Sequence, residues 1–294
     1  MQTELYETRF SECPCCLKDK IETFYNNPTP KNIETWQEFF YGGRDYFSQI
    51  SKCASCDFQW MDVLPDDYVR LYEAQETGGY DALDKSRIKY FEKLKNMVDR
   101  ELGEGFPLKQ GILDIGCGNG AWLKLWKDRA PLYGAEINKT HIDSFTKHGI
   151  QHVTDEQIHN EKYSMICLFD YLEHVESPER FLTELAPSLA EDSAMVIGVP
   201  DMGKLIARIM GERYYLYCPM HFSYFNKKSL EILLKRVFPD CRISVFKSPA
   251  MQFDTESVLK WVGCEDIKLG KLNLWSPIGY KASLIAVVQK KQAA

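Results

Sequence analysis

A glycine-rich loop between an apolar strand and a helix restricts the fold of this chain more than any other segment. The strand Ile112-Leu113-Asp114-Ile115 runs into Gly116-Cys117-Gly118-Asn119-Gly120, and a helix is predicted from Ala121. Glycines permit a tight turn and a close approach of ligand to backbone, and a helix N-terminus supplies unpaired N–H groups. Glu136 ends the next predicted strand, 20 residues after Gly116, where a carboxylate can accept the hydroxyls of a ribose. This order of strand, loop, helix, strand and acid indicates a nucleoside site; a turn needed only for packing is the alternative.

Around this loop, short apolar runs alternate with helical ones. Strands are predicted at 111–115, 132–137, 163–169 and 194–199, and helices at 121–128, 139–148, 178–189 and 229–237. Strands that alternate with helices predict parallel crossovers and a sheet covered on both faces. Two further β-rich runs, 241–246 and 282–288, show no clear helical crossover between them, so we expect them to pair antiparallel at the sheet edge. The predicted fold class is therefore α/β, a Rossmann-like doubly wound sheet.

Composition divides the chain into three parts. Residues 1–62 are rich in cysteine and aromatic residues without a sustained helical stripe, which predicts a small zinc-ribbon-like module with a thin core of its own. Residues 63–104 carry amphipathic stretches that predict a helical lead-in, and residues 105–294 form the α/β domain. An insertion at 250–280 has the length of a lid or binding loop; a surface excursion or an oligomer contact is the alternative.

Four of the ten cysteines form two C-x-x-C pairs. Cys13 and Cys16 make the first pair, and Cys53 and Cys56 the second. Four thiolates so paired suit tetrahedral zinc, with Zn–S bonds of about 2.3 Å. Because no coordination position would stay open, the predicted Zn²⁺ is structural. Chance clustering and redox or iron–sulfur use are the alternatives.

Charge and hydropathy narrow the choice of partners. Lys plus Arg number 36 and Asp plus Glu number 42, a net charge of −6, with no long basic block. Nucleic-acid binding ordinarily needs a positive footprint. The N-terminal segment lacks the features of a secretory signal, and no stretch approaches the length of a membrane span. We therefore expect a cytoplasmic protein with a small-molecule substrate, no nucleic acid and no membrane contact, while the oligomeric state stays open.

The glycine loop also resembles a known family motif. Dinucleotide sites use G-x-G-x-x-G, whereas this loop has G-x-G-x-G with Asp114 two residues ahead. Leu113-Asp114-Ile115-Gly116-Cys117-Gly118-Asn119-Gly120 resembles motif I of the class I S-adenosylmethionine-dependent methyltransferases, and the similarity extends to Phe169-Asp170-Tyr171-Leu172-Glu173-His174-Val175 and to His221-Phe222-Ser223-Tyr224-Phe225. It covers about residues 100 to 290. The resemblance implies a seven-stranded sheet whose last strand is antiparallel.

The resemblance implies S-adenosyl-L-methionine as the cofactor and assigns residues to it. Gly116 and Gly118 would let the methionine part lie on the loop, Glu136 would hold the ribose, and Phe169 would close the methionine side. The adenine contact would fall within 155–157. The further candidates for cofactor binding are Asp114, Cys117, Gly120, Ile137, Glu156 and, in the helical lead-in, Tyr80 and Arg87.

Methyl transfer to a hydroxyl or a carbon acid needs an aligned acceptor and a base. His221 is the predicted general base, since histidine titrates near neutrality, with His174 or Asp170 orienting the acceptor and Tyr224 beside them. A purely structural role is the alternative for His174, and core packing is the alternative for the aromatic segment around His221.

The N-terminal module resembles the zinc-binding domain of bacterial methyltransferases that act on sugar nucleotides and natural products. We therefore expect transfer to a small molecule, first to a hydroxyl of a sugar or secondary metabolite. The alternatives are C-methylation of a sugar nucleotide, RNA methylation, and a non-catalytic protein that binds the cofactor and zinc. We also expect the module, with the aromatic stretch Trp36 to Phe47, to form one wall of the acceptor pocket.

Overall fold

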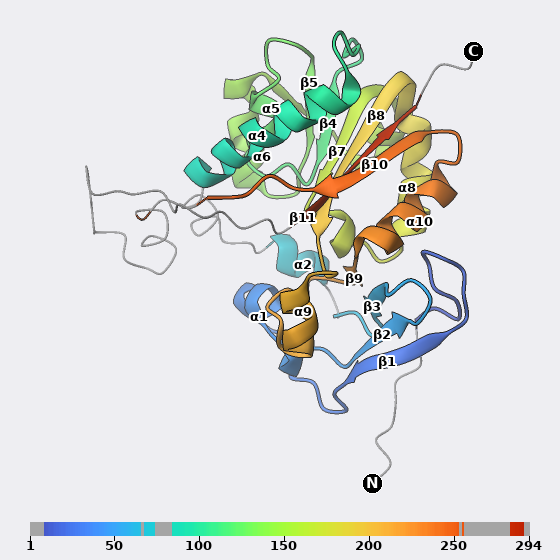
Figure 1. Cartoon of the computed structure of the whole chain (residues 1–294). Helices are drawn as coiled ribbons and strands as arrows, with labels where there is room; N and C mark the ends of the chain where they lie inside the picture. The colour runs from blue at the N-terminus through green and yellow to red at the C-terminus, as the bar shows by residue number, and fades with distance from the viewer. Residues whose placement is uncertain (1–8, 66–67, 74–83, 253–254, 256–282, 291–294) are drawn as a thin grey trace.

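Two β-sheets organise the chain in the computed structural model (Figure 1). The structure describes residues 9–65, 68–73, 84–252, 255 and 283–290. The predicted candidate Tyr80 and nearly all of the predicted insertion at 250–280 lie outside these residues.

The larger sheet has seven strands in the order β10-β11-β8-β7-β4-β5-β6. Their bounds are β4 Ile112–Ile115, β5 Leu132–Ala135, β6 Ile150–His152, β7 Tyr163–Phe169, β8 Leu189–Pro200, β10 Arg242–Lys247 and β11 Ser283–Gln289. Strands β6, β5, β4, β7 and β8 are parallel to one another, whereas β11 pairs antiparallel with both β8 and β10. The α/β prediction and the antiparallel pairing of the last two runs are confirmed.

Helices cover both faces of this sheet because its central strands are apolar on both sides. One face packs Leu113, Ile166 and Ile197 against α8 (Pro178–Leu185) and α10 (Lys227–Val237). The other face packs Ile112, Met165 and Val196 against α4 (Asp84–Leu102) and α5 (Ala121–Lys124). Alternate residues of one strand thus enter different cores, as expected when successive side chains point to opposite faces. The remaining helices of this part are α6 (Lys139–Phe145), α7 (Asp155–Asn160) and α9 (Leu205–Met210).

The smaller sheet has the order β1-β2-β3-β9, and its strands β1, β2 and β3 lie at the opposite end of the molecule from β5 (Figure 1). It comprises β1 Ile21–Asn26, β2 Gln49–Cys53, β3 Gln59–Met61 and β9 Ser223–Tyr224, and α1 (Trp36–Tyr41) and α2 (Tyr68–Glu73) accompany it. Asp62 ties this part together, because its buried carboxylate accepts hydrogen bonds from Gln49, Ser51, Trp60 and the Arg9 main chain. The fourth strand comes from the far side of the predicted boundary at residue 62.

Several element lengths differ from the prediction. The helix expected over 121–128 ends at Lys124, because Leu125 and Trp126 donate to carbonyls three residues back and the turn tightens. The strand expected over 194–199 begins at Leu189. Among the described residues, no helix combines the length and the hydropathy needed to cross a membrane.

Candidate active site and cysteine cluster

The glycine loop lies at the carboxyl ends of β4, β5 and β7, which meet at one edge of the parallel sheet. Gly116 and Gly118 have φ of +72° and +53°, the left-handed region that favours glycine. A Cβ at Gly116 would stand 2.6 Å from the Tyr171 ring. The loop conformation and the packing of Tyr171 both require glycine at this position.

Glu136 is fixed beside this loop by main-chain amides. Its Oε2 accepts from the Gly118 amide at 2.8 Å, and its Oε1 accepts from the Ile137 and Asn138 amides at 2.9 Å each. A carboxylate has about four lone-pair sites, so Oε2 keeps one for a hydroxyl. Ile137 next to it is 55% exposed and offers an apolar surface on the cavity wall.

The loop opens into a cavity of about 1950 Å³. This volume exceeds the roughly 300–1,000 Å³ of a typical small-molecule pocket, so it can hold two ligands together. Its lining near the loop includes the predicted residues Asp114, Gly116, Cys117, Gly118, Glu136, Ile137, Phe169 and Arg87.

Two other predicted cofactor residues do not line the cavity. A Cβ at Gly120 (φ +73°) would stand 2.5 Å from the Ile150 side chain, so packing against Ile150 requires glycine at this position. Glu156 is exposed on α7, and its neighbour Asp155 lines the cavity instead.

Electrostatics couples three groups on the cavity wall. Burial raises the pKa of Asp114 well above its usual value, and the Arg87 cation on α4 opposes this. Burial also raises the pKa of Asp170 to about 6, again with Arg87 opposing. Asp170 follows β7 directly and has φ of +49°, a left-handed conformation that is uncommon outside glycine.

Three further groups meet at the end of the cavity away from Glu136. His174 and Glu173 lie on the short 3-10 turn Leu172–His174, and His221 precedes β9. The His174 and His221 rings are 4.9 Å apart between centroids, and His174 Nε2 lies 3.9 Å from Glu173 Oε1. The predicted residues Asp170, His174 and His221 and the unpredicted Glu173 all line the cavity.

Burial lowers the pKa of both imidazoles. That of His174 falls to about 4, although the Met220 and Asp170 carbonyls oppose the shift, and that of His221 falls to about 3, with His174 adding to the effect. Both rings are therefore neutral near pH 7 and bind protons weakly.

Tyr224, the fourth predicted catalytic residue, lies behind this end of the cavity and does not line it. Its ring is buried against Tyr217, with centroids 4.8 Å apart, and its centroid is 6.4 Å from that of His221. The N-terminal part supplies wall residues as well: Trp36 and Phe40 of α1 belong to the aromatic stretch expected to line the acceptor pocket, whereas Tyr72 of α2 was not predicted. The Tyr72 hydroxyl lies 2.8 Å from His174 Nδ1.

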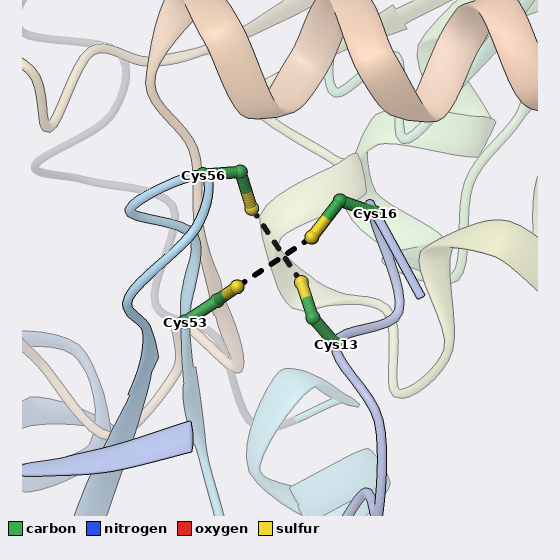
Figure 2. A group of neighbouring side chains, drawn as sticks. All are labelled: Cys13, Cys16, Cys53 and Cys56. Carbon is green, nitrogen blue, oxygen red and sulfur yellow. Dashed lines mark hydrogen bonds between the residues drawn. The ribbon is translucent and has the colours of Figure 1, made fainter. Parts of the chain in front are cut away.

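The four paired cysteines converge (Figure 2). Cys13 and Cys56 Sγ are 3.5 Å apart, as are Cys16 and Cys53 Sγ. Sulfurs around a tetrahedral zinc are separated by about 3.8 Å, which follows from Zn–S bonds of about 2.3 Å. Cys15 is buried but stands outside the group.

The two C-x-x-C turns also share one backbone design. Leu17 and Asp57, each following its pair, have φ of +55° and +58° and donate to the first cysteine carbonyl of that pair at 2.9 Å. Ser55 N donates to Cys53 Sγ at 3.3 Å, a contact that stabilises a thiolate. Sulfur spacing and matched turns both fit a closed tetrahedral metal site.

A family comparison agrees with this architecture. A family model described as a methyltransferase domain matches residues 86–237. The chain belongs to this methyltransferase family. It is a methyltransferase enzyme with the class I α/β fold, and the glycine loop, Glu136 and Asp170 all fall within the matched region.

Solved structures give weaker similarity. A SAM-dependent methyltransferase from Archaeoglobus fulgidus has 18% identity and a TM-score of 0.49, over 72% of this chain and 99% of that one. The plantazolicin methyltransferase BpumL, in complex with a monoazolic desmethylPZN analog and SAH, has 20% identity and a TM-score of 0.44, over 76% and 89%. A possible histamine N-methyltransferase from Thermotoga maritima has 14% identity and a TM-score of 0.44, over 73% and 100%. No curated protein matches the chain.

Proposed function

We propose that this methyltransferase uses S-adenosyl-L-methionine to methylate a hydroxyl of a small molecule. The observation that carries the proposal is that two sets of residues line the same cavity. The first is the glycine loop with Glu136, and the second is Asp170 with Glu173, His174 and His221. The cofactor would supply an activated methyl on its sulfonium.

The loop end of the cavity has the groups that this cofactor needs. The free lone pair of Glu136 suits a ribose hydroxyl, and Ile137 offers an apolar face to adenine. Arg87, placed between Asp114 and Asp170, suits the methionine carboxylate, and Asp114 suits its ammonium. Phe169, held between Phe91 and Trp122, closes the methionine side.

Proton transfer is assigned to Asp170. Its pKa of about 6 lies nearer to neutrality than those of His174 and His221, so it is the stronger base among these groups at the acceptor end. Asp170 would take the hydroxyl proton as the acceptor oxygen bonds to the methyl group, which the bound cofactor would supply from its sulfonium, leaving a neutral thioether. His174 and His221 then bind and orient the acceptor rather than remove its proton.

The four cysteines are proposed to bind a structural Zn²⁺. Its closed thiolate set leaves no place for a substrate, so its part is to hold β1, β2 and the preceding segment together.

Calorimetry followed by turnover tests the proposal. S-adenosylhomocysteine, titrated into zinc-loaded protein, is expected to bind at one site, and Glu136→Ala is expected to weaken that binding while Glu161→Ala, an exposed glutamate outside the cavity lining, leaves it unchanged. Release of S-adenosylhomocysteine is then measured with hydroxyl-bearing sugars and phenols as acceptors. Absence of binding to the wild-type protein would refute the cofactor assignment, and binding without turnover of any acceptor would favour a non-catalytic protein.

A further inference from the structure

Glu173, His174 and His221 lie together at the end of the cavity assigned to the methyl acceptor. Each offers an atom that can only accept a hydrogen bond, and no donor among the described residues lies between these atoms. His221 Nδ1 donates to the Leu216 carbonyl at 2.8 Å, and His174 Nδ1 donates to the Met220 carbonyl at 2.7 Å. A carbonyl oxygen can only accept, so His221 carries its proton on Nδ1; His174 does the same, since the Tyr72 hydroxyl 2.8 Å from its Nδ1 donates to the Met220 carbonyl and leaves that proton to the ring. In the neutral rings this leaves each Nε2 as a lone-pair acceptor.

Glu173 completes the group. Its side chain is 1% exposed, and neither carboxylate oxygen makes a hydrogen bond within the described part of the chain. Burying a carboxylate without hydrogen-bond partners costs free energy of folding. Native proteins therefore rarely contain such a group unless it contacts a ligand, an ion or a shared proton. One nitrogen of each imidazole and one Glu173 oxygen lie within 4.8 Å of one another.

We propose that Glu173, His174 and His221 bind a divalent transition-metal cation in the acceptor pocket. Imidazole nitrogens held by backbone carbonyls through their other nitrogen are the usual form of metal-binding histidine, since that contact fixes the tautomer. Two imidazoles and one carboxylate suit Fe²⁺, Mn²⁺, Co²⁺ or Zn²⁺, with positions left open for a substrate. The turn Leu172–His174 and the segment before β9 are joined by a main-chain bond from Phe222 N to the Glu173 carbonyl at 2.8 Å, which keeps the three ligands together.

The spacing is close to that of a bound site. Ligand atoms about 2.1 Å from one ion are separated by about 3.0–4.2 Å. The 3.9 Å between His174 Nε2 and Glu173 Oε1 falls inside this interval. The widest pair is separated by up to 4.8 Å, about 0.6 Å more than the upper end of this interval.

This inference rests on the proposed function and narrows its substrate class. A cation on the cavity wall would hold an acceptor through two neighbouring oxygens, and it would lower the pKa of the coordinated hydroxyl that Asp170 deprotonates. The acceptor is then a vicinal diol, a catechol or a hydroxy acid. The cation differs from the proposed zinc at the cysteines, which has no open position.

Cobalt distinguishes this site from the cysteine site. Co²⁺ is titrated into zinc-loaded protein, with calorimetry for stoichiometry and visible absorption for the ligand type. One equivalent is expected, with d–d bands and without the sulfur-to-cobalt charge-transfer band that exchange into the cysteine site would give. In Glu173→Gln and His221→Ala the Co²⁺ affinity is expected to fall at least about 100-fold.

Controls separate binding from folding and from the proposed function. His159→Ala removes an exposed histidine on α7, outside the cavity lining, and is expected to keep the full Co²⁺ equivalent. S-adenosylhomocysteine binding is measured on every variant to confirm the fold, and its absence from the wild type would refute the cofactor proposal without touching the metal result. If the wild type takes up no Co²⁺, Mn²⁺, Fe²⁺ or Zn²⁺ beyond the cysteine site, or if Glu173→Gln binds Co²⁺ as tightly as wild type, the metal proposal is wrong and a shared proton occupies the group.

Discussion

Gly116→Ala is the substitution that best tests whether the cofactor binds against the glycine loop. Two separate effects act at this position. The φ of +72° places an alanine in the left-handed region, and its Cβ would stand 2.6 Å from the Tyr171 ring. The ring must move, and Tyr171 itself lines the cavity.

Gly149→Ala isolates the first effect. Gly149 has φ of +66°, nearly the same as Gly116, but a Cβ there would meet no atom within 4 Å, and the residue does not line the cavity. Left-handed backbone costs an L-residue about 1–2 kcal/mol, so Gly149→Ala should lower the free energy of unfolding by about that amount. Gly116→Ala should cost this plus about 1–3 kcal/mol for the forced shift of a packed ring.

Urea unfolding and calorimetry with S-adenosylhomocysteine measure the two consequences. Gly149→Ala is expected to bind the ligand as the wild type does, whereas Gly116→Ala is expected to lose at least about tenfold, equivalent to 1.4 kcal/mol. In a Tyr171→Ala background the clash is absent, so Gly116→Ala should there cost only the backbone term, about as much as Gly149→Ala. If Gly116→Ala and Gly149→Ala bind S-adenosylhomocysteine with equal affinity, the glycine loop does not contact the cofactor.

Three further predictions concern other parts of the site. Asp155→Ala should weaken S-adenosylhomocysteine binding by about 1 kcal/mol in calorimetry, whereas Glu156→Ala, outside the cavity lining, should not change it; the reverse result would restore the sequence-based assignment. With Asp170 as base, the rate of methyl transfer should rise with pH through about 6 as this carboxyl ionises. The groups near it are Arg87, Tyr90, Glu173 and the His174 ring. Asp170→Asn should abolish that step in the pH–rate profile while keeping cofactor affinity. Cys53→Ser should lower zinc content below one equivalent and reduce the melting temperature, while Cys15→Ser, which removes a thiol outside the group, should retain the zinc; equal zinc in both would contradict the assignment.

The sequence was most informative where local chemistry determines structure. Strand β7 has the predicted bounds of 163 and 169, because its residues are apolar except for Ser164 and the run ends at the charged Asp170. The order of the glycine loop, helix and Glu136 likewise follows from turn geometry alone. The two cysteine pairs were identified from spacing, and their sulfurs converge in the structure.

Other features depend on contacts between distant parts of the chain. Strand β9 pairs with β3, Gln59 opposite Tyr224, and no local pattern in a two-residue strand announces that partner. Glu173 was seen in the sequence as part of a motif, but its role depends on a buried carboxylate lying between two histidines, one of them 48 residues away. Tyr72 was missed for the same reason, since its ring reaches the cavity only through the packing of α2.

The smaller sheet connects the cysteine module to the methyltransferase domain. Zinc at the four cysteines would fix β2 and the turn that leads into β3, and β3 pairs with β9. Met61 N donates to the Phe222 carbonyl at 3.0 Å, and Phe222 N donates to the Glu173 carbonyl, so His221 and Glu173 are positioned by main-chain bonds that begin in the module. The glycine loop and Glu136 receive no such bonds from β1, β2 or β3 among the described residues, because their partners lie on β5, on β6, just before α6 and within the loop itself. The module therefore supports the acceptor end of the cavity and leaves the cofactor end to the parallel sheet. That division follows from strand pairing alone, and it accounts for acceptor-facing aromatic residues being drawn from the first 72 residues of the chain.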